Sequence, residues 1–432
     1  MDRARPFLAV LALLFCDLPA AAEDASIPLW ASETLTALCK AAASGERIDA
    51  DRLAELVHAT PDTAAIIADE PARLRAAAMR DRLELDIMVL APGTMNQQGR
   101  MMATMPEARG EPAKPLFFVQ TGTDCLPERG RAVSYVLNGP ADRLFHFAGP
   151  LLERGDIEAL NPAVPPGDAS PGYIVAHVDT GVAYTLPEIA ARLARNPDGS
   201  LIGADLAEND GLPFDLDPQA GPLFPRRHGT SVAAILLREA PGTMLAPIRY
   251  PGRRYDLFGN IVSAVKESGA TIAAMPFGGN RLQDWTEFQA AAKAAPEILF
   301  VVSAGNDGRD IDQAPVYPAS LKLDNLLVVT SCDEFGQLAA ESNWGAESVD
   351  VAVPAENLET LDHRGAKVKA AGASYAVPRV AALAARLGQA HPDWSASQIK
   401  AHIVSAATPL RHAEATPVRH GWIPDPTRVA VQ

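Results

Sequence analysis

Residues 372–378 read GASYAVP, and the run RVAALAARL follows directly at 379–387. Gly372 allows a tight backbone turn without the steric cost of a Cβ atom, and the run rich in Ala and Leu favours a helix. Ser374 is therefore predicted to lie at a helix N-terminus, where free N–H groups and the helix dipole stabilise a developing negative charge. That environment suits a nucleophilic serine, although Gly-x-Ser before a helix is most often only an N-terminal cap.

From residue 170 onward, short apolar runs alternate with segments of helical periodicity. Apolar strands that alternate with helices predict an α/β fold, in which a mostly parallel sheet is covered by helices on both faces. The active crevice of such a sheet lies at the carboxyl ends of the strands, so the residues that close each strand matter most for function. Strands are expected at 173–178, 244–248, 271–275, 299–303 and 325–330, and helices at 231–238, 260–267, 288–294 and 395–407.

Three polar residues occupy positions of this kind. Asp179 closes the first strand, His228 begins a helix, and Asn306 follows a strand in a Gly-rich turn. A carboxylate can orient an imidazole, an imidazole can take a proton from a serine, and an amide can donate to an oxyanion. Each residue also has a purely structural interpretation as a turn or core residue. We interpret His177, on the same strand face as Asp179, as a satisfied core histidine.

The joint order Asp, His, Asn, Ser decides between these interpretations, because Asp before His before Ser is the order of the subtilisin triad. On these residues the chain resembles the subtilase family of serine peptidases, over about residues 173–429. The resemblance implies a subtilisin-like three-layer fold for residues 166–432. Supporting segments are API at 246–248, MPFGG at 275–279, YPA at 317–319 and SNWG at 342–345.

By this resemblance the chain is a serine endopeptidase that hydrolyses peptide bonds through an acyl-enzyme intermediate. Ser374 is the expected nucleophile and His228 the base that takes its proton. Asp179 orients His228, and Asn306 donates to the oxyanion together with the Ser374 backbone N–H. The alternative is a non-catalytic subtilase-fold binding or scaffold protein, which the four filled positions disfavour.

The resemblance also implies a substrate-binding cleft in which an extended peptide adds as a strand. Val316 stands where many relatives have a small residue at the floor of the specificity pocket. We therefore expect a shallow pocket that prefers small or medium apolar side chains. The residues expected to bind substrate are Phe277, Gly278, Gly279, Ser303, Ala304, Gly305 and Val316.

The chain departs from the family pattern around the nucleophile. The family motif usually reads Gly-Thr-Ser followed by Met or His, whereas Ala373 and Tyr375 flank Ser374 here. Pro276 replaces a usual serine, so its carbonyl stays available but it has no N–H group. Neither Ala373 nor Tyr375 removes a group that the chemistry requires.

No metal or other cofactor is expected, with calcium as the open alternative. The acidic residues in 205–217 carry the hard oxygen ligands that calcium prefers. Their spacing matches no ligand loop, and we interpret the stretch as a solvated loop. The residues concerned are Asp205, Glu208, Asn209, Asp210, Asp215 and Asp217.

The first 22 residues read as a secretory signal peptide, with Arg3 and Arg5 before the apolar run 7–15 and alanines at 20–22. The chain is therefore expected to be exported to the periplasm or the medium. A lipoprotein signal with Cys16 as the lipidated residue is the competing interpretation. No later apolar run is long enough to cross a bilayer.

Residues 23–165 predict a smaller mixed α+β region, with helices in 23–60 and strands at 83–90, 116–119 and 133–137, before a connector rich in proline near residue 165. The family suggests a pro-region that is removed, but a permanent accessory domain fits equally. Three cysteines remain after the leader, and the odd count leaves at least one unpaired, without assigning a pair. They are Cys39, Cys125 and Cys332.

The composition restricts the partners. The 432 residues carry a formal net charge of −15 and no basic stripe, which disfavours nucleic acid. A nucleotide-binding fold would need a Gly-x-Gly-x-x-Gly turn after an early strand, and the first strand here ends in Asp-Thr-Gly. Protein or peptide substrates are the expected partners of a monomeric enzyme.

Overall fold

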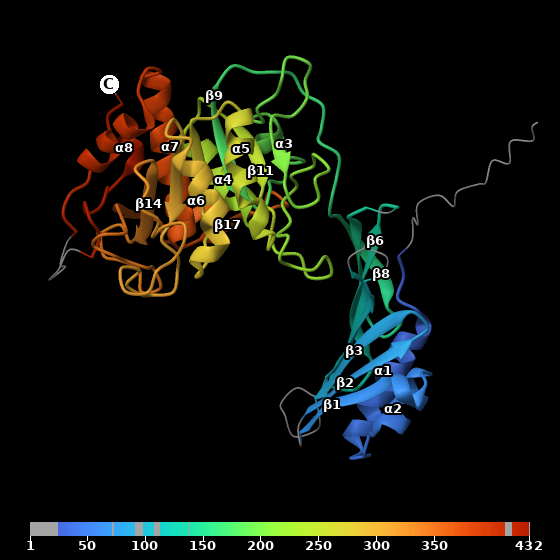
Figure 1. Ribbon diagram of the computed structural model, residues 1–432. Helices are drawn as coiled ribbons and strands as arrows, with labels where there is room; N and C mark the ends of the chain where they lie inside the picture. Colours follow the sequence, from blue (N-terminus) through green and yellow to red (C-terminus); the bar gives the residue numbers. More distant parts are fainter. Residues whose placement is uncertain are drawn as a thin grey trace, which may run out of the picture. The chain divides into compact units, whose positions relative to one another are not determined.

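The chain divides into one unit that ends at Ala159 and a second that begins at Leu160. The computed structural model describes residues 25–70, 73–90, 98–107, 113–137, 139–410 and 417–431 (Figure 1). The expected signal peptide, with Cys16, lies outside these residues. Whether residues 23–165 are removed as a pro-region stays a prediction.

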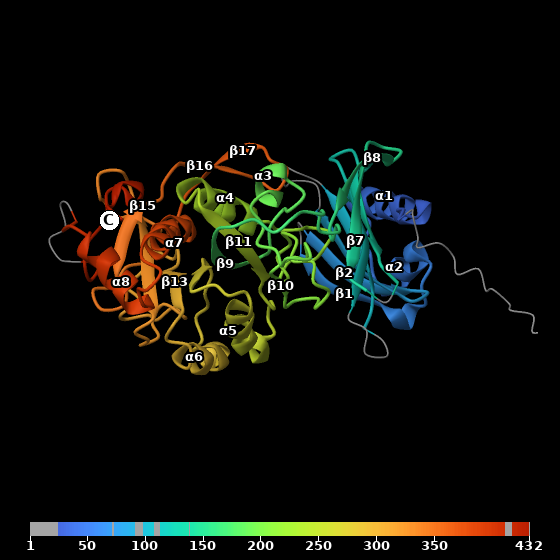
Figure 2. The same cartoon turned by 90° about the horizontal axis from the view of Figure 1, so that it is seen from above.

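The first unit is an antiparallel sheet whose eight strands follow one another in chain order, with two helices on one face (Figures 1 and 2). Alternation along β3 buries Leu85, Ile87 and Val89 in the same core as Leu35 and Leu38 of α1. The elements are α1 (Leu29–Ala43), α2 (Ala50–Val57), η1 (Pro61–Thr63), β1 (Ala64–Glu70), β2 (Arg73–Arg80), β3 (Leu83–Leu90), β4 (Gly99–Met105), β5 (Lys114–Thr121), β6 (Pro127–Tyr135), β7 (Ala141–Ala148) and β8 (Glu153–Ala159).

The predicted α+β character of this unit is confirmed, and so is the strand at 83–90. Several strands were not predicted, and two of them, β2 and β8, contain few of the β-branched and aromatic residues that favour strands. β2 reads RLRAAAMR and β8 reads ERGDIEA. In these segments, pairing with the neighbouring strands determines the conformation, and the local sequence preference does not.

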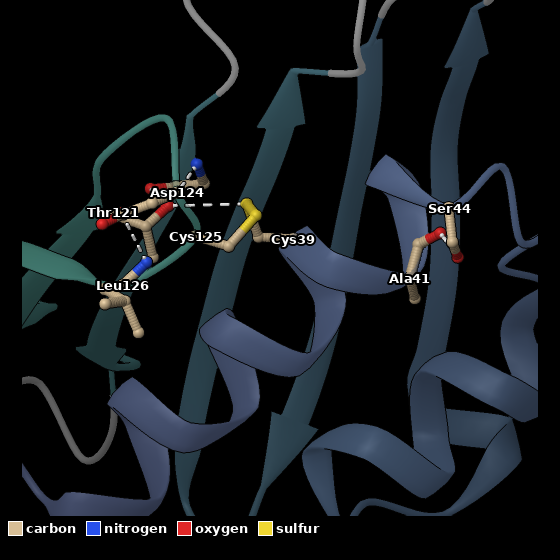
Figure 3. The surroundings of a disulfide bond; sticks show 8 residues. Cys39, Ala41, Ser44, Thr121, Asp124, Cys125 and Leu126 are labelled. Atoms are coloured by element: carbon tan, nitrogen blue, oxygen red, sulfur yellow. Dashed lines mark hydrogen bonds between the residues drawn. A yellow bond between two sulfur atoms is a disulfide. The ribbon is translucent and has the colours of Figure 1, made fainter.

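A disulfide joins Cys39 of α1 to Cys125 in the turn between β5 and β6 (Figure 3). The Thr121 hydroxyl contacts the Cys39 sulfur at 3.7 Å. Cys332 in the second unit is free and buried, and its burial raises the pKa of its thiol. The sequence predicted an unpaired thiol, and the structure identifies it as Cys332.

The second unit is built on a fully parallel sheet of seven strands in the order β10-β11-β9-β12-β13-β14-β15. All its strand pairs are parallel, in agreement with the prediction from the buried apolar runs. The strands are β9 (Tyr173–Asp179), β10 (Ala204–Asp205), β11 (Thr243–Arg249), β12 (Ile272–Met275), β13 (Leu299–Ser303), β14 (Leu326–Cys332) and β15 (Val351–Pro354); β16 (Leu358–Leu361) and β17 (Lys367–Ala370) form a separate hairpin.

Helices cover both faces of this sheet, which gives three layers (Figure 2). Along β9, Val175 packs with α4, α7 and α8 on one face, whereas Ala176 and Val178 pack with α5 and α6 on the other. The predicted α/β fold is confirmed. The helices are α3 (Pro187–Ala190), α4 (Gly229–Glu239), α5 (Phe258–Glu267), α6 (Thr286–Lys293), α7 (Ala373–Ala390) and α8 (Ala396–Ser405), with 3-10 turns η2 (Tyr255–Leu257), η3 (Leu282–Trp285) and η4 (Pro426–Arg428).

No helix in the described parts of the chain is long and apolar enough to span a bilayer.

The disulfide predicts a measurable contribution to the stability of the first unit. It closes a loop with a sequence separation of 86 residues. Replacing both cysteines with serine should lower the stability of this unit by about 2–5 kcal/mol, since the open chain gains conformational freedom when unfolded. Faster amide hydrogen exchange in α1 and β5, with unchanged exchange in β9 and β13, would be the expected result. Unchanged exchange in α1 would contradict it.

Candidate active site

Ser374 lies in the first turn of α7, as the sequence predicted. Gly372 precedes the helix with a φ of 115°, a conformation that L side chains rarely adopt. A Cβ atom on Gly372 would also lie 3.0 Å from the Asn306 side chain. The hydroxyl of Ser374 donates a hydrogen bond to the Pro276 carbonyl (3.0 Å), so this carbonyl is engaged.

Asp179 and His228 form a direct hydrogen bond. The Nδ1 atom of His228 lies 2.9 Å from Oδ1 and 3.0 Å from Oδ2 of Asp179. Asp179 closes β9 and its side chain is 2% exposed, whereas the His228 side chain, at the start of α4, is 31% exposed. The bond to Nδ1 leaves Nε2 as the nitrogen that can exchange a proton.

The pKa values of the pair shift in opposite directions. Burial alone lowers the pKa of His228, but the charge and hydrogen bond of Asp179 and the charges of Asp215 and Asp217 raise it above its ordinary value. Burial alone raises the pKa of Asp179, but the charge and hydrogen bond of His228 lower it below its ordinary value. The arrangement stabilises a charged imidazolium next to a carboxylate.

Asn306 lies beside the start of α7. Its side-chain Oδ1 accepts a hydrogen bond from the Ala373 backbone N–H (2.8 Å). This bond fixes the orientation of the amide and leaves the Nδ2 group as its donor. An exposed amide donor next to the N-terminus of α7 has the chemistry of an oxyanion donor.

The expected substrate-binding segment 277–279 follows β12. The backbone groups of Gly279 pair in both directions with Tyr317, each at 2.7 Å. The Phe277 ring packs against Tyr250, with 4.8 Å between ring centroids. Val316 is 4% exposed, and its Cγ1 lies 3.3 Å from where a Cβ atom of Gly278 would stand.

Segment 303–305 is anchored through its backbone. The N–H of Ala304 donates to Val329 in β14 (2.9 Å), and Asn343 binds the carbonyls of Ala304 (2.8 Å) and Gly305 (3.0 Å). The Ser303 hydroxyl accepts from the Gly305 N–H (3.1 Å). Asn343 therefore supports this turn; the sequence pointed to it only through the SNWG segment.

The interpretation of the acidic stretch as a solvated loop holds for Glu208, Asn209 and Asp210, which are exposed, but it is wrong for Asp205 and Asp215. Asp205 is 3% exposed and pairs with Arg249 at 2.9 Å, and Asp215 is fully buried. The carboxylates are buried because hydrogen-bond donors of the folded unit surround them, which composition does not reveal. No group of three or more His, Cys, Asp or Glu residues that could hold a metal occurs among the residues that the structure describes. The metal expectation stays a prediction.

Two side chains near His228 carry contacts that the sequence did not predict. The Tyr375 ring lies 5.7 Å from the His228 ring, and its hydroxyl is 3.3 Å from that of Ser231. His177 is fully buried as predicted, and its Nε2 is bonded to the Gly229 carbonyl (2.9 Å), but its Nδ1 has no hydrogen-bond partner among the residues that the structure describes. Its interpretation as a satisfied histidine is therefore only half correct.

Residues 170–422 match the Subtilase family (Peptidase_S8), and the chain belongs to this family. A thermophilic serine proteinase of Bacillus sp. (strain AK1) is 30% identical over 234 residues, which cover 50% of this chain and 52% of that protein. Subtilisin BL of Lederbergia lenta is 26% identical over 254 residues, which cover 55% of this chain and 84% of that protein. The chain thus spans about half the length of the Bacillus relative.

One solved structure is similar in fold to this chain. The A-subunit of the AB5 toxin from E. coli aligns with a TM-score of 0.50 and 18% sequence identity, over 60% of this chain and 91% of that chain. At this identity the similarity shows the fold alone.

The raised pKa of His228 predicts how the reactivity of Ser374 depends on pH. A protonated His228 cannot accept the serine proton, and the pKa of His228 lies above the ordinary value of 6.5. The rate of labelling by a fluorophosphonate should therefore fall as the pH is lowered through a midpoint above 6.5. In Asp179→Asn the midpoint should fall, and the rate should drop by about 10⁴-fold. A wild-type midpoint at or below 6.5 would contradict the assigned pairing.

Proposed function

We propose that this chain is an exported serine endopeptidase that cleaves proteins or peptides as a monomer. The observation that carries the proposal is the hydrogen bond between the buried Asp179 and His228, in a chain that places Ser374 at a helix N-terminus. A buried carboxylate that orients the base, together with a serine at a positive helix end, is suited to nucleophilic catalysis. The membership of the subtilase family supports the same reaction class.

In the proposed mechanism, the hydroxyl of Ser374 turns from the Pro276 carbonyl and attacks the peptide carbonyl carbon. Its proton passes to Nε2 of His228, and Asp179 stabilises the imidazolium through Nδ1–H. The amide Nδ2 of Asn306 and the Ser374 N–H hold the oxyanion. His228 then gives the proton to the leaving amine as the C–N bond breaks. Water hydrolyses the acyl-enzyme by the reverse proton transfers.

The substrate would bind as an extended strand along Phe277 and Gly278, and Gly279 would support this segment, since its own backbone groups pair with Tyr317. Val316 stands close to Gly278 and Gly305, so it occupies space that a large side chain of the substrate would need. We propose a preference for small or medium apolar side chains before the cleaved bond. Segment 303–305 would form the opposite wall of this pocket.

Export is supported by the N-terminal leader sequence and by the disulfide between Cys39 and Cys125, since structural disulfides persist in oxidising compartments. We propose further that residues 23–165 act as a pro-region, with a permanent accessory domain as the alternative outcome. Catalysis needs no metal or cofactor in this mechanism, because the side chains and backbone groups supply every proton transfer and charge stabilisation.

Labelling by a fluorophosphonate tests the proposed nucleophile. The intact mass of the exported protein should increase by one adduct, and Ser374→Ala should gain none. A starting mass without residues 23–165 would identify this region as a removed pro-segment. Labelling that appears only after limited proteolysis of the first unit would identify a zymogen.

Two results would contradict the proposal. One is equal labelling of the wild type and Ser374→Ala, which would place the reactive serine elsewhere. The other is an absence of labelling that persists after the first unit has been removed. That outcome would favour the non-catalytic binding protein.

The pocket assignment predicts a change in specificity. In Val316→Ala, kcat/KM for substrates with Phe before the cleaved bond should rise by roughly 10-fold, since the smaller side chain admits the ring. A peptide-library cleavage profile measures this. Val262→Ala truncates a valine of similar burial in α5 and should leave the profile unchanged. A wild-type profile dominated by Phe, Tyr or basic residues would contradict the assignment.

A further inference from the structure

Asp215 lies in the segment before α4 and is completely buried, although it belongs to the acidic stretch 205–217. A buried carboxylate is costly unless hydrogen bonds compensate for the lost water. All the groups that approach the Asp215 carboxylate within hydrogen-bond distance are donors. They come from two separate segments of the second unit, and both segments carry residues of the candidate active site.

One carboxylate oxygen faces the turn after β9. Oδ1 of Asp215 accepts from the Thr180 hydroxyl (2.6 Å) and from the His228 backbone N–H (3.1 Å). The other oxygen faces α4. Oδ2 accepts from the backbone N–H (2.9 Å) and the hydroxyl (2.5 Å) of Thr230. Asp215 therefore bonds to the neighbour of Asp179, to His228 itself and to the first turn of the helix that His228 begins.

These bonds supply hydrogen-bond acceptors that the start of α4 needs. The first N–H groups of a helix need acceptors, which the N-cap side chain commonly supplies. The N-cap here is His228, whose side chain makes no capping bond because its Nδ1 binds Asp179. Asp215 and Thr180 supply the acceptors instead; the Thr180 oxygen accepts from the N–H groups of Gly229 (2.9 Å) and His228 (3.2 Å).

The surrounding backbone leaves little space for an alternative arrangement. A Cβ atom on Gly229 would overlap the Gly181 carbonyl, and a Cβ atom on Gly181 would overlap the carbonyls of Pro213 and Phe214. The turn after β9, the segment around Asp215 and the start of α4 are therefore in close contact. A shift of any one of them would move Asp179 relative to His228.

We propose that Asp215 is a positioning residue, which holds His228 against Asp179 by joining the turn after β9 to the first turn of α4. It acts through Thr180 and Thr230 and does not touch the substrate. This inference rests on the proposed peptidase function for its kinetic consequences, but its effect on His228 can be measured without any activity.

Asp215 also has an electrostatic effect on His228, since its negative charge favours the protonated imidazole. Other charged or titratable groups face His228 from several elements. The β9 strand contributes Asp179 and His177, the segment before α4 contributes Asp217 and Arg227, α7 contributes Tyr375, and the β16–β17 hairpin contributes Asp362, His363 and Lys369. A test must therefore change Asp215 alone and compare it with an equal change of charge nearby.

The direct test is the titration of the His228 imidazole by NMR in Asp215→Asn. The variant keeps the size of the side chain but removes its charge, so the pKa of His228 should fall. The control is Asp210→Asn, which removes one charge from the same acidic stretch at an exposed side chain that bonds to Asn161 and Leu212. The pKa of His228 should be unchanged in this control.

A second pair of variants removes the link without touching Asp215. Thr180→Val deletes the hydroxyl that joins the turn after β9 to Asp215 and to the start of α4, and Thr180→Ser retains it. We expect Thr180→Val and Asp215→Asn to lower kcat by roughly 10- to 100-fold with little change in KM, because the base is misplaced and the substrate site is not. Thr180→Ser and Asp210→Asn should remain within about 2-fold of the wild type.

The outcomes separate the two proposals. An unchanged pKa of His228 in Asp215→Asn, or equal kcat in Thr180→Val and Thr180→Ser, would overturn the positioning role while leaving the peptidase proposal intact. A wild type that never labels at Ser374 would overturn the peptidase proposal. The NMR titration of His228 in Thr180→Val and Thr180→Ser, which change no charge, would still decide the positioning role, because only Thr180→Val should lower the pKa of His228. If Asp215→Asn does not fold, the comparison of the two Thr180 variants decides it.

Discussion

The hydrogen bond between Asp179 and His228 is the interaction on which the candidate active site of the second unit depends. It joins the end of a central strand to the start of a helix on the face of the sheet. The carboxylate is buried and the imidazole is partly exposed, so the pair can hold a charge at one end and exchange a proton at the other. Two glycines, Gly181 and Gly229, allow the backbone segments to approach closely enough for this bond.

A second ionic contact fixes the two helices that carry the candidate catalytic side chains. Arg379 of α7 is 8% exposed, and its Nε donates to Glu239 at the end of α4 (3.0 Å). Its Nη1 donates to the carbonyl of Pro354, the last residue of β15 (2.6 Å). Removing one partner of a buried ion pair leaves an uncompensated buried charge, so this contact favours one arrangement of the two helices. Here it ties the helix that follows Ser374 to the helix that begins at His228.

The two units differ in how much of their structure the sequence predicts. In the second unit β9, β11, β12, β13 and β14 are continuous apolar runs, because helices bury both faces of a parallel sheet, and their positions were predicted to within a few residues. The short edge strands β10 and β15 were not predicted. In the first unit the two helices cover only one face of the sheet, and the other face carries side chains of every kind. Segments such as β2 and β8 therefore carry little strand signal, and their pairing came only from the structure.

The printed sequence is enough to predict the α/β fold of the second unit, the helix that begins beside Ser374 and the order of the four site residues. These features depend on local preferences and on motifs that are contiguous in the chain. The folded structure was needed to show which acidic residues are buried, which cysteines pair and which groups surround His228. Asp215 and Thr180 are 35 residues apart in the sequence, and both lie in turns of ordinary sequence. Their roles come from contacts between distant segments, which no local pattern encodes.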